Sequence, residues 1–313
     1  MHRLSLHTII APVAPYRLDL TAQALRRVSS NVVDVFTAEG TYLRAFSGDD
    51  GVNIVEVQQQ TDGALDVRIT GRGARARVET VTTMLGTGVD LRRWYRRTAR
   101  FPWLATLARE LRGVKPPQYP DFWEALCNGI VFQQLSISAA STIMRRLVER
   151  FSEPQEHHGV RLYPFPGPDR IVRARDQDLQ RLGLSRQKAA YLKGAAAEAK
   201  SHMLISARIQ SLPTSEALVE LQKFSGIGQW SAANILLRGF GRLDVFPPSD
   251  SGAAQNIKLL SSDPQISLNE VLLSLGDMRG MLYFHLLLGK LRRPAASLPS
   301  PSQRHSPLPR CLP

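Results

Sequence analysis

The pattern of hydrophobic and polar residues differs between two parts of this chain. In the first 89 residues, short alternating or β-branched runs are separated by aspartate–glycine pairs, a pattern typical of antiparallel hairpins. Strands are predicted for residues 32–36, 42–46, 52–57 and 65–69, hairpin turns for 48–51 and 61–63, and helices for 21–28 and 76–85. This part is therefore predicted to be a small antiparallel sheet with one or two helices.

From residue 90 onwards, the hydrophobic period is that of amphipathic helices. Asp121 and Glu124 form a capping-box pair before an apolar run that ends near Gln134. Further helices are predicted for residues 137–151, 186–199, 214–224, 230–237, 253–260, 267–275 and 279–291, the last apolar enough to be buried. The predicted fold class is α+β, with a sheet domain in residues 1–89 followed by an all-α domain in residues 90–291.

Residues 292–313 differ from both parts in composition. They hold six of the chain's twenty prolines, several serines and four arginines without any acidic residue. Such a segment can bury little apolar surface, so we expect a disordered, basic, proline-rich tail. Its role stays open.

The most informative local pattern is a pair of glycines, Gly226 and Gly228, between the helices predicted for residues 214–224 and 230–237. Glycines let a backbone turn tightly and approach a ligand closely, because no Cβ intervenes. The amides at the start of the second helix, including that of Ser231, then face outward at the positive end of the helix dipole. Such amides suit an anion such as a phosphate. A Gly-x-Gly pair also occurs in ordinary tight turns, so the pattern alone does not decide between the two uses.

The charge of the chain favours a polyanionic partner. The formal net charge is +13 and the pI is near 10.3, and removing the four arginines of the tail leaves +9, so most of the excess lies in the predicted domains. Attraction to nucleic acid is the expected consequence. Arginine-rich patches also occur on ribosomal and membrane-surface proteins, so charge supports DNA without proving it.

Cysteine usage and hydropathy indicate a reduced compartment. The chain has only Cys127 and Cys311, too few for a disulfide framework or for a four-cysteine iron–sulfur cluster. No run approaches eighteen apolar residues, and no signal-peptide pattern opens the chain. We therefore expect a cytoplasmic protein, nucleoid-associated if the source is bacterial, with no membrane partner.

Two histidine positions have structural interpretations. His157 and His158 are adjacent in a polar loop and are expected to be solvated. His285 lies in the apolar helix predicted for residues 279–291, where a hydrogen-bonded core histidine is more common than a catalytic one.

Asp250 follows Gly228 by twenty-two residues, after two prolines and a serine and before the helix predicted for residues 253–260. Together with the glycine hairpin, this arrangement resembles the helix-hairpin-helix, Gly/Pro/Asp superfamily of base-excision DNA glycosylases, and within it the inducible type II 3-methyladenine glycosylases. The resemblance runs through residues 90–290 in order, and other segments that carry it are 121–140, 165–168, 182–189 and 279–285. Type II glycosylases also carry an antiparallel N-terminal domain.

The resemblance implies that Asp250 is the catalytic residue. A lone carboxylate suits the reaction, because an alkylated purine is already a good leaving group and the barrier lies in the oxocarbenium-like sugar. A fixed anion beside C1′ stabilises that charge and can orient water. The alternative is that Asp250 is an ordinary helix N-cap or turn residue.

Trp230 stands where lyase-active relatives have a lysine, whose amine attacks C1′ to form a Schiff base. Tryptophan cannot do so, and Lys223 is predicted to lie on the preceding helix. The resemblance therefore implies a monofunctional enzyme, which releases the base without cleaving the strand. In the family this residue lies against the extruded base, where an indole face stacks on an electron-poor ring. A core-filling role for Trp230 is the alternative.

The chain departs from the type II pattern in the base pocket. Positions at which a close relative has aromatic residues hold Asn234, Ser251 and Met278. Tyr283 and Phe284 are candidates to replace those aromatics, although both also suit a core. The preference for cationic bases and the exact base specificity stay open.

The resemblance implies two further contacts with DNA. Gln134 and Leu135 fall where relatives insert a side chain into the gap left by the flipped nucleotide. A polar helix end beside a buried leucine is the alternative. The backbone carbonyls of Gln222, Phe224 and Ile227 are implied ligands of a Na⁺ or K⁺ ion that bridges the hairpin to a phosphate. No cofactor is expected for catalysis.

The function expected from these features is excision of alkylated purines such as 3-methyladenine from double-stranded DNA by a monomer. One alternative is a non-catalytic helix-hairpin-helix module, which would use the hairpin for phosphate docking and would not need Asp250. A glycosylase/lyase for oxidised bases is a second alternative, and Trp230 disfavours it.

Overall fold

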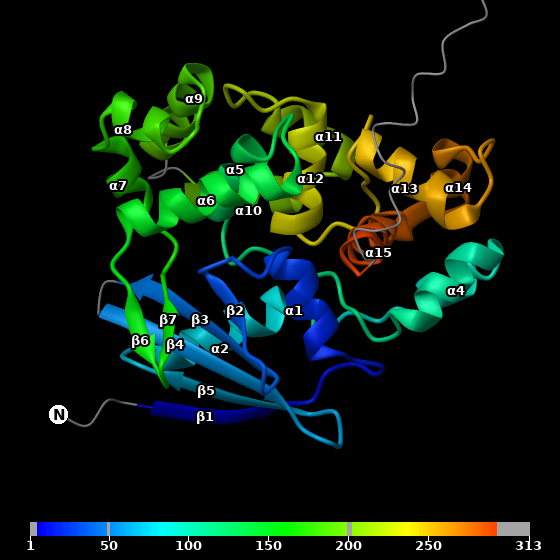
Figure 1. Cartoon of the computed structure of the whole chain (residues 1–313), viewed down its shortest axis with the longest axis horizontal. Coiled ribbons are helices and arrows are strands. Elements are labelled where there is room, and N and C mark those ends of the chain that lie inside the picture. Colours follow the sequence, from blue (N-terminus) through cyan, green and yellow to red (C-terminus); the bar gives the residue numbers. More distant parts are fainter. Residues whose placement is uncertain (1–4, 49–50, 199–201, 293–313) are drawn as a thin grey trace, which may run out of the picture.

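The structure is a computed structural model that describes residues 5–48, 51–198 and 202–292. Five strands form an antiparallel sheet in the N-terminal part, and helices dominate the remainder of the described chain (Figure 1). The predicted α+β class is confirmed. The tail at residues 293–313 and the tip of the turn predicted for residues 48–51 lie outside the described residues.

The sheet has the strand order β1-β5-β4-β3-β2, and every neighbouring pair is antiparallel. Its strands are β1 (Ser5–Ile10), β2 (Asp34–Phe36), β3 (Thr41–Gly48), β4 (Gly51–Gln59) and β5 (Leu65–Thr70). The hydrophobic pattern predicts the last four and misses β1. No residue of this edge strand is fully buried, so its sequence has no strong apolar face.

Helices α1 (Leu18–Arg26) and α2 (Ala74–Met84) pack on one face of this sheet. Tyr42, Val55 and Val57 point from β3 and β4 into the core that these helices share with the sheet. Because side chains alternate along a strand, the opposite face carries Leu43 and Ala45. Both predicted helices are thus present, with ends shifted by one to three residues.

The helices that follow lie on the far side of α1 from the sheet (Figure 1). They are α3 (Arg92–Thr98), α4 (Pro102–Glu110), α5 (Phe122–Val131), α6 (Ile137–Phe151), α7 (Pro168–Val172), α8 (Asp176–Arg181), α9 (Arg186–Ala197), α10 (His202–Ser211), α11 (Thr214–Leu221), α12 (Gln229–Gly239), α13 (Ser251–Ser261), α14 (Leu268–Leu275) and α15 (Gly280–Leu291), with a 3-10 turn, η2 (Gly276–Met278), before α15. The sequence pattern misses α3, α4, α7, α8 and α10, which have ten residues or fewer and offer few turns for a period to emerge.

A two-stranded hairpin interrupts the helical part, formed by β6 (Gln155–His157) and β7 (Val160–Leu162). Leu162 packs with Leu43, Ala45 and Ile54 on the outer face of the main sheet. The expectation of helices alone after residue 90 is therefore wrong here. Strands of three residues are too short to show a period, and their stability comes from docking on a distant sheet.

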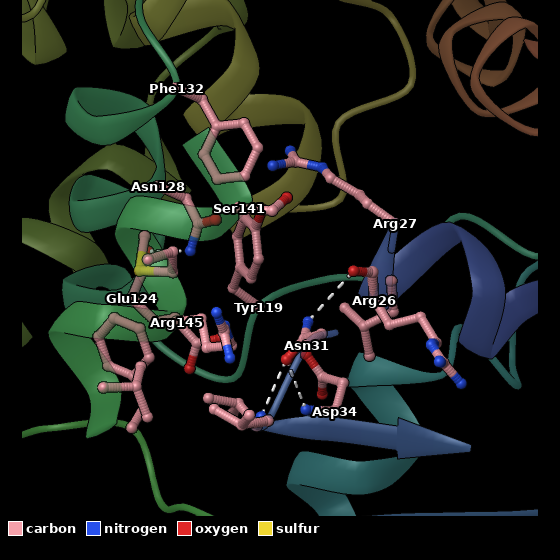
Figure 2. A pocket seen from close by; sticks show the side chains of 16 residues that line it. Arg26, Arg27, Asn31, Asp34, Tyr119, Glu124, Asn128, Phe132, Ser141 and Arg145 are labelled. Atoms are coloured by element: carbon pink, nitrogen blue, oxygen red, sulfur yellow. Dashed lines mark hydrogen bonds between the residues drawn. The ribbon is translucent and has the colours of Figure 1, made fainter. Parts of the chain in front are cut away.

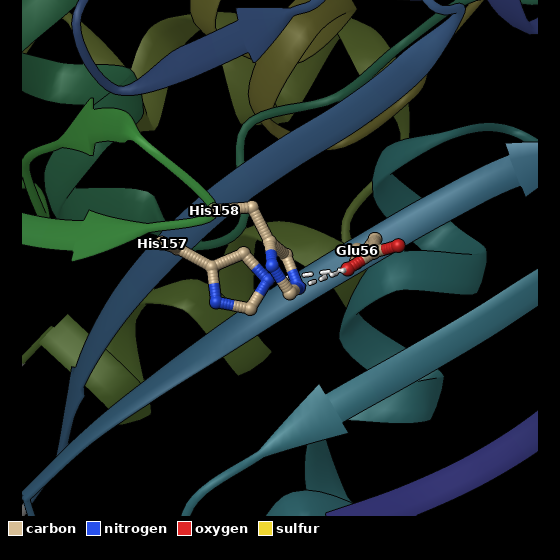
Figure 3. A group of neighbouring side chains, drawn as sticks. All are labelled: Glu56, His157 and His158. Carbon is tan, nitrogen blue, oxygen red and sulfur yellow. Dashed lines mark hydrogen bonds and ion pairs between the residues drawn. The ribbon is translucent and has the colours of Figure 1, made fainter.

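The same hairpin corrects the expectation for His157. Its Nε2 lies 3.1 Å from Oε2 of Glu56 on β4, and its side chain is only 13% exposed (Figure 3). His158 is 77% exposed, as expected for a solvated residue. The His157–Glu56 contact fastens the hairpin to the sheet.

One hydrophobic core extends through both parts of the chain, from Leu18 and Val57 to Leu126 and Leu282. His285 lies in it, fully buried, as predicted. Its Nδ1 lies 2.9 Å from the carbonyl of Met281, and the indole of Trp94 donates to its Nε2 at 3.3 Å. Burial lowers the pKa of His285 to about 4, so the ring is neutral at pH 7. The domain boundary near residue 89 stays a prediction.

No single helix in the described ranges is long and apolar enough to cross a lipid bilayer. The segments Leu268–Met278 and Gly280–Leu291, which are bent by 118° relative to each other, pass this test of length and composition only when taken together. Most residues of α15 are buried within the protein.

A buried ionic cluster links the sheet to α5. Nη1 of Arg44 donates to Oδ1 of Asp34 at 2.7 Å, its Nη2 donates to Glu124 on α5, and Tyr42 donates to the same Asp34 oxygen at 2.7 Å. The Arg44 side chain is 1% exposed. Burial raises the pKa of Glu124 to about 8, although Arg44 acts in the opposite direction and Asp34 adds to the rise. Arg44 therefore serves chiefly as the counter-ion of Asp34.

Replacing Arg44 should destabilise the fold far more than neutralising Glu124. Arg44→Met leaves Asp34 buried without its cation, which should lower the free energy of unfolding by about 3–5 kcal/mol. Glu124→Gln keeps an acceptor for Arg44 and should cost about 1 kcal/mol. Urea unfolding followed by circular dichroism measures both. Equal losses for the two variants would contradict this division of roles.

Candidate active site

A cleft of about 1240 Å³ lies between the α5–α6 loop, α9, the α11–α12 turn, the start of α13 and α15. The residues predicted for catalysis, base stacking, intercalation, phosphate contact and cation binding all line it: Gln134, Leu135, Gln222, Phe224, Gly226, Ile227, Gly228, Trp230, Ser231, Asp250 and Tyr283. These residues come from four separate segments, which the fold brings together.

The α11–α12 turn gives its two glycines different roles. Gly226 has φ +83°, and a Cβ there would lie 2.2 Å from the ring of Tyr191. Gly228 has φ −89° and ψ −177°, and a Cβ there would meet no atom within 4 Å. The turn therefore requires a glycine at Gly226, whereas Gly228 leaves open space in front of the N-terminus of α12. No side chain caps that N-terminus, so its first amides are available to a ligand.

Gln133 ties the α5–α6 loop to the α11–α12 turn. Its Nε2 donates to the carbonyl of Gly226 at 2.6 Å and to Oγ of Ser231 at 2.8 Å. The Ser231 hydroxyl in turn donates to the carbonyl of Gly129 on α5 at 3.0 Å. Ser231 is 2% exposed, so its hydroxyl braces the turn and only its backbone amide is left for the predicted phosphate contact.

Lys188 on α9 braces the same loop from the other side. Its Nζ donates to the carbonyl of Val131 at 2.9 Å and to that of Gln133 at 2.6 Å. Burial lowers the pKa of Lys188. The ammonium group caps the C-terminal end of α5, where a cation is favourable.

The braced loop presents Gln134 and Leu135 at the mouth of the cleft. Gln134 has φ +53°, and Leu135 is 39% exposed, unusual for a large apolar side chain. Ser136 caps α6 by accepting the amide of Ala139 at 3.2 Å, so the loop ends in a fixed helix start. This exposure suits the predicted wedge better than the alternative of a buried leucine.

Asp250 is both an N-cap and a cleft residue. Its Oδ1 accepts the amide of Ala253 at 2.9 Å, and its Oδ2 accepts the indole N–H of Trp230 at 3.2 Å. Ser249 before it has φ +54°, a left-handed conformation that turns the chain into the cleft. Both carboxylate oxygens are thus fixed by neutral donors, and each keeps a free lone pair.

Trp230 is half-buried, and its N–H edge is committed to Asp250. An in-plane hydrogen bond leaves the faces of an indole free for stacking. Tyr283 on α15 also lines the cleft and is half-buried. Burial raises the pKa of Tyr283, but the cations of Arg27 and Arg238 outweigh it, and the net shift is downward.

The other pocket candidates divide between cleft and core. Phe284 is fully buried and does not line the cleft, so of its two predicted roles the structure favours the core over the pocket. Asn234 and Met278 are also buried outside the cleft lining, whereas Ser251 lines it. Consecutive side chains on a helix point in different directions, so Tyr283 on α15 lines the cleft whereas Phe284 lies in the core.

Gln222, Phe224 and Ile227, whose carbonyls are predicted to hold a monovalent cation, all line the cleft. The carbonyl of Phe224 accepts the amide of Ile227 at 3.0 Å, which leaves it one further lone pair. Gln222 is the C-cap of α11, where carbonyls lack partners within the helix. This donor set is of the oxygen-only kind that Na⁺ and K⁺ accept.

The cleft lining is cationic apart from one carboxylate. Arg27, Lys188, Lys223 and Lys290 line it, and Asp250 is the one acidic residue among the described residues of the lining. Lys223 is paired with Glu220 at 2.6 Å just outside. This arrangement suits a polyanion in the cleft and a single fixed anion within it.

The comparisons with known proteins agree with this geometry. The sequence pattern of the HhH-GPD superfamily of base excision DNA repair proteins matches residues 127–272, a stretch that contains the α11–α12 turn and Asp250.

Individual relatives extend this picture. The chain is 31% identical over 171 residues to a DNA-3-methyladenine glycosylase of Bacillus subtilis (strain 168), covering 55% of this chain and 56% of the relative. It is 30% identical over 150 residues to DNA-3-methyladenine glycosylase 2 of Escherichia coli (strain K12), covering 47% and 51%. The chain thus spans about half the length of the curated relatives it matches.

The fold is shared more widely than the sequence. The structure of a 3-methyladenine DNA-glycosylase from Archaeoglobus fulgidus superimposes with a TM-score of 0.76 at 23% identity, over 90% of this chain and 97% of that chain. An 8-oxoguanine glycosylase/lyase of Clostridium acetobutylicum with DNA gives 0.70 at 20% identity, over 92% and 97%. These matches include the N-terminal sheet, which lies outside the HhH-GPD residues.

Sequence reasoning misses three residues of the cleft: Arg27, Gln133 as a brace, and Lys188. Gln133 and Lys188 act through backbone carbonyls of distant segments, which no local pattern reveals. Arg27 comes from the sheet part of the chain. It shares with Gln134 and Ser249 a positive φ, and these are three of the five non-glycine residues with positive φ in the described ranges.

The α11–α12 turn should tolerate alanine at only one of its two glycines. Gly226→Ala combines a positive φ with a clash against Tyr191 and should lower the free energy of unfolding by about 2 kcal/mol or more. Gly228→Ala should change it by less than about 0.5 kcal/mol. Thermal and urea unfolding give the comparison. A Gly228→Ala protein as unstable as Gly226→Ala would disprove the open space at Gly228.

Proposed function

We propose that this chain is a monofunctional DNA glycosylase that releases alkylated purines, 3-methyladenine among them, from double-stranded DNA. The observation that carries the proposal is the fixed carboxylate of Asp250 in a cationic cleft beside an indole. The names of the B. subtilis and E. coli relatives support the substrate class. We further propose that the protein acts as a monomer.

Docking on DNA would use the rim of the cleft. The open space at Gly228 and the uncapped start of α12 let a phosphate approach backbone amides. Leu135 and Gln134 would fill the gap left by an extruded nucleotide and compensate for part of the lost stacking. These contacts read the backbone and not the sequence of bases, so binding should be sequence-independent.

The chemistry would rest on Asp250. As the C1′–N bond lengthens, positive charge develops on the sugar, and a carboxylate held by two neutral donors needs no rearrangement to stabilise it. The free lone pairs of the same carboxylate can accept a proton from the attacking water. An extruded base would stack on the face of Trp230.

A lyase reaction is disfavoured because Trp230 stands where lyase-active relatives have a lysine, and because two of the three lysines in the described lining have partners. Lys188 is held by two carbonyls, and Lys223 is paired with Glu220.

We also propose that the carbonyls of Gln222, Phe224 and Ile227 hold Na⁺ or K⁺ when DNA is bound. Such an ion would supply positive charge between the turn and a phosphate.

Replacing Asp250 by asparagine should abolish base release and spare the fold. Asparagine can still cap α13 through its one oxygen, but its NH2 group then faces the indole N–H of Trp230, so the free energy of unfolding should fall by about 1 kcal/mol. Loss of the anion should slow release of 3-methyladenine from methylated duplex DNA by about 100-fold or more under single-turnover conditions. DNA binding, measured by fluorescence anisotropy, should be retained.

Asp244→Asn is the matched control for this experiment. Asp244 is exposed, lies six residues earlier and accepts the hydroxyl of Thr214 at 2.6 Å, outside the cleft lining. Its activity should equal that of the unmodified protein. If neither the unmodified protein nor the control releases bases while both bind DNA, the non-catalytic module is the better description.

Borohydride should trap no covalent complex between the protein and its DNA, because a Schiff base requires an amine at C1′. The product should be an intact strand with an abasic site, nicked only after alkali. Denaturing gels of the reaction with and without borohydride distinguish the outcomes. Efficient trapping would refute the monofunctional assignment, and Lys188→Met and Lys290→Met would then identify the amine.

A further inference from the structure

Three side chains from two distant segments meet on the outer face of the sheet. Glu56 belongs to β4, and His157 and His158 come from the tip of the β6–β7 hairpin that lies beside it (Figure 3). Nε2 of His157 lies 3.1 Å from Oε2 of Glu56, and Nε2 of His158 lies 3.8 Å from the same oxygen. These three residues do not line the cleft, so they take no part in the proposed chemistry.

The turn of the hairpin brings the two imidazole rings together. His157 pairs with Val160, so His158 and Gly159 form a two-residue turn, with φ +49° and +75°. Consecutive side chains of a regular strand point to opposite faces. The positive φ at His158, which is uncommon for a residue other than glycine, places its ring beside that of His157, with the ring centroids 4.2 Å apart. The turn thus supplies a second nitrogen next to Glu56.

Packing at the base of the hairpin fixes its tip over the sheet. Leu162 is fully buried against Leu43 and Ile54 on the outer face. The amide of Tyr163, just after β7, donates to the carbonyl of Val32 at 3.0 Å. The two histidines and the carboxylate are therefore held close together by the fold, before any ligand binds.

The hairpin is a second link between α6 and the sheet. The direct junction beside it is not completely packed, because a pocket of about 40 Å³ lies between the segment of Asn31 and Asp34 and the helices α5 and α6, which contribute Asn128 and Arg145 (Figure 2). The hairpin follows α6 in the chain and crosses the outer face of the sheet (Figure 1). A bond at its tip would strengthen this second link.

The three ligand atoms have the spacing of a metal centre. All of them lie within 4.8 Å of one another. In a tetrahedral zinc site, bonds of about 2.0–2.2 Å place neighbouring ligand atoms about 3.3–3.6 Å apart. The distances from Oε2 of Glu56 to the two histidine nitrogens, 3.1 and 3.8 Å, lie on either side of that range. A small rotation of the exposed His158 side chain is enough to complete the geometry.

The donor set selects the class of ion. Two imidazoles and a carboxylate are typical ligands of Zn²⁺, whereas Ca²⁺ and Mg²⁺ prefer oxygen ligands. Oε1 of Glu56 lies 3.5 Å from Nη1 of Arg68, which orients the carboxylate. Nη2 of Arg68 lies 3.3 Å from Oδ2 of Asp66, so one guanidinium is shared by two carboxylates. One formal negative charge is left over, and a bound cation can offset it.

We propose that Glu56, His157 and His158 bind one Zn²⁺ ion, which fastens the β6–β7 hairpin to the sheet. Three protein ligands leave the fourth position to a water molecule. The ligands come from segments about 100 residues apart and meet only in the folded chain, so the ion should stabilise the fold. The site is separate from the cleft, and its existence does not depend on the proposed glycosylase activity.

Calorimetric titration of the chelator-treated full chain with ZnCl₂ tests the proposal. One ion should bind per chain, and saturation should raise the melting temperature by about 2 °C or more. Zinc should also slow amide hydrogen exchange in residues 155–162, because opening of the hairpin would require release of the ion. Absence of one-to-one binding, or exchange in the hairpin that zinc does not change, would overturn the proposal.

Two variants separate ligation from folding. His158→Asn keeps a residue that tolerates a positive φ, so the melting temperature without zinc should change little. Glu56→Gln keeps the shape of the side chain and removes the charged ligand. Each variant should weaken zinc binding by about 100-fold or more, since loss of a partner of a ligand already costs about 10- to 100-fold. If both variants bind zinc as tightly as the unmodified protein, the ion is held elsewhere and the proposal is wrong.

His7→Ala is the matched control for these variants. His7 lies on β1, is 59% exposed and has its Nε2 3.2 Å from Oδ2 of Asp66, but it does not belong to the three-residue cluster. Its zinc affinity and the protection of its hairpin should equal those of the unmodified protein. Loss of zinc binding in this variant, with binding retained in His158→Asn, would place the ion at His7 and Asp66 and would overturn the proposal.

Discussion

The close contact between α5 and α12 sets the distance between the two rims of the cleft. A Cβ at Gly129 on α5 would lie 2.9 Å from the side chain of Ile235, and one at Gly239 on α12 would lie 2.6 Å from Cβ of Ala125. Two glycines therefore allow the helices to pack more closely than side chains would permit. Helix α5 leads directly into the α5–α6 loop, and α12 begins at the α11–α12 turn, so this one contact fixes the DNA-facing loops relative to each other.

Polar contacts hold helix α5 at both of its ends. Every residue of α5 is buried, and its N-terminal turn is held by Arg44 of the sheet while its C-terminal end is held by Lys188 of α9. Gln133 and Ser231 then connect α5 with the turn. A hydrogen-bond network of this kind specifies one geometry, because breaking any member leaves a buried group without a partner. The active site is thus organised by buried polar contacts, and its loops have little freedom of their own.

The sequence predicts those features of the site that local physics determines. Period and capping give the helices, the glycine pair gives the turn, and the proline segment gives the aspartate before α13. It does not separate the two glycines, because only the fold reveals that Tyr191 packs against Gly226 and nothing packs against Gly228. The brace by Gln133 joins residues 93 positions apart, and the hairpin β6–β7 depends on a sheet more than 100 residues earlier in the chain. Such partners leave no local signature.

The electrostatics of the cleft reconcile two opposite demands. DNA phosphates need cations around the rim, whereas an oxocarbenium-like sugar needs an anion at the centre. A carboxylate among cations would ordinarily form an ion pair, and the paired cation would offset its negative charge. Here the amine of Lys188 is engaged by carbonyls and that of Lys223 by Glu220, while Asp250 is held by an indole N–H and a backbone amide. Neutral donors fix the position of Asp250 without cancelling its charge. The carboxylate is therefore held in place with no cation paired to it among the described residues, so its charge faces the positive charge that develops on the sugar.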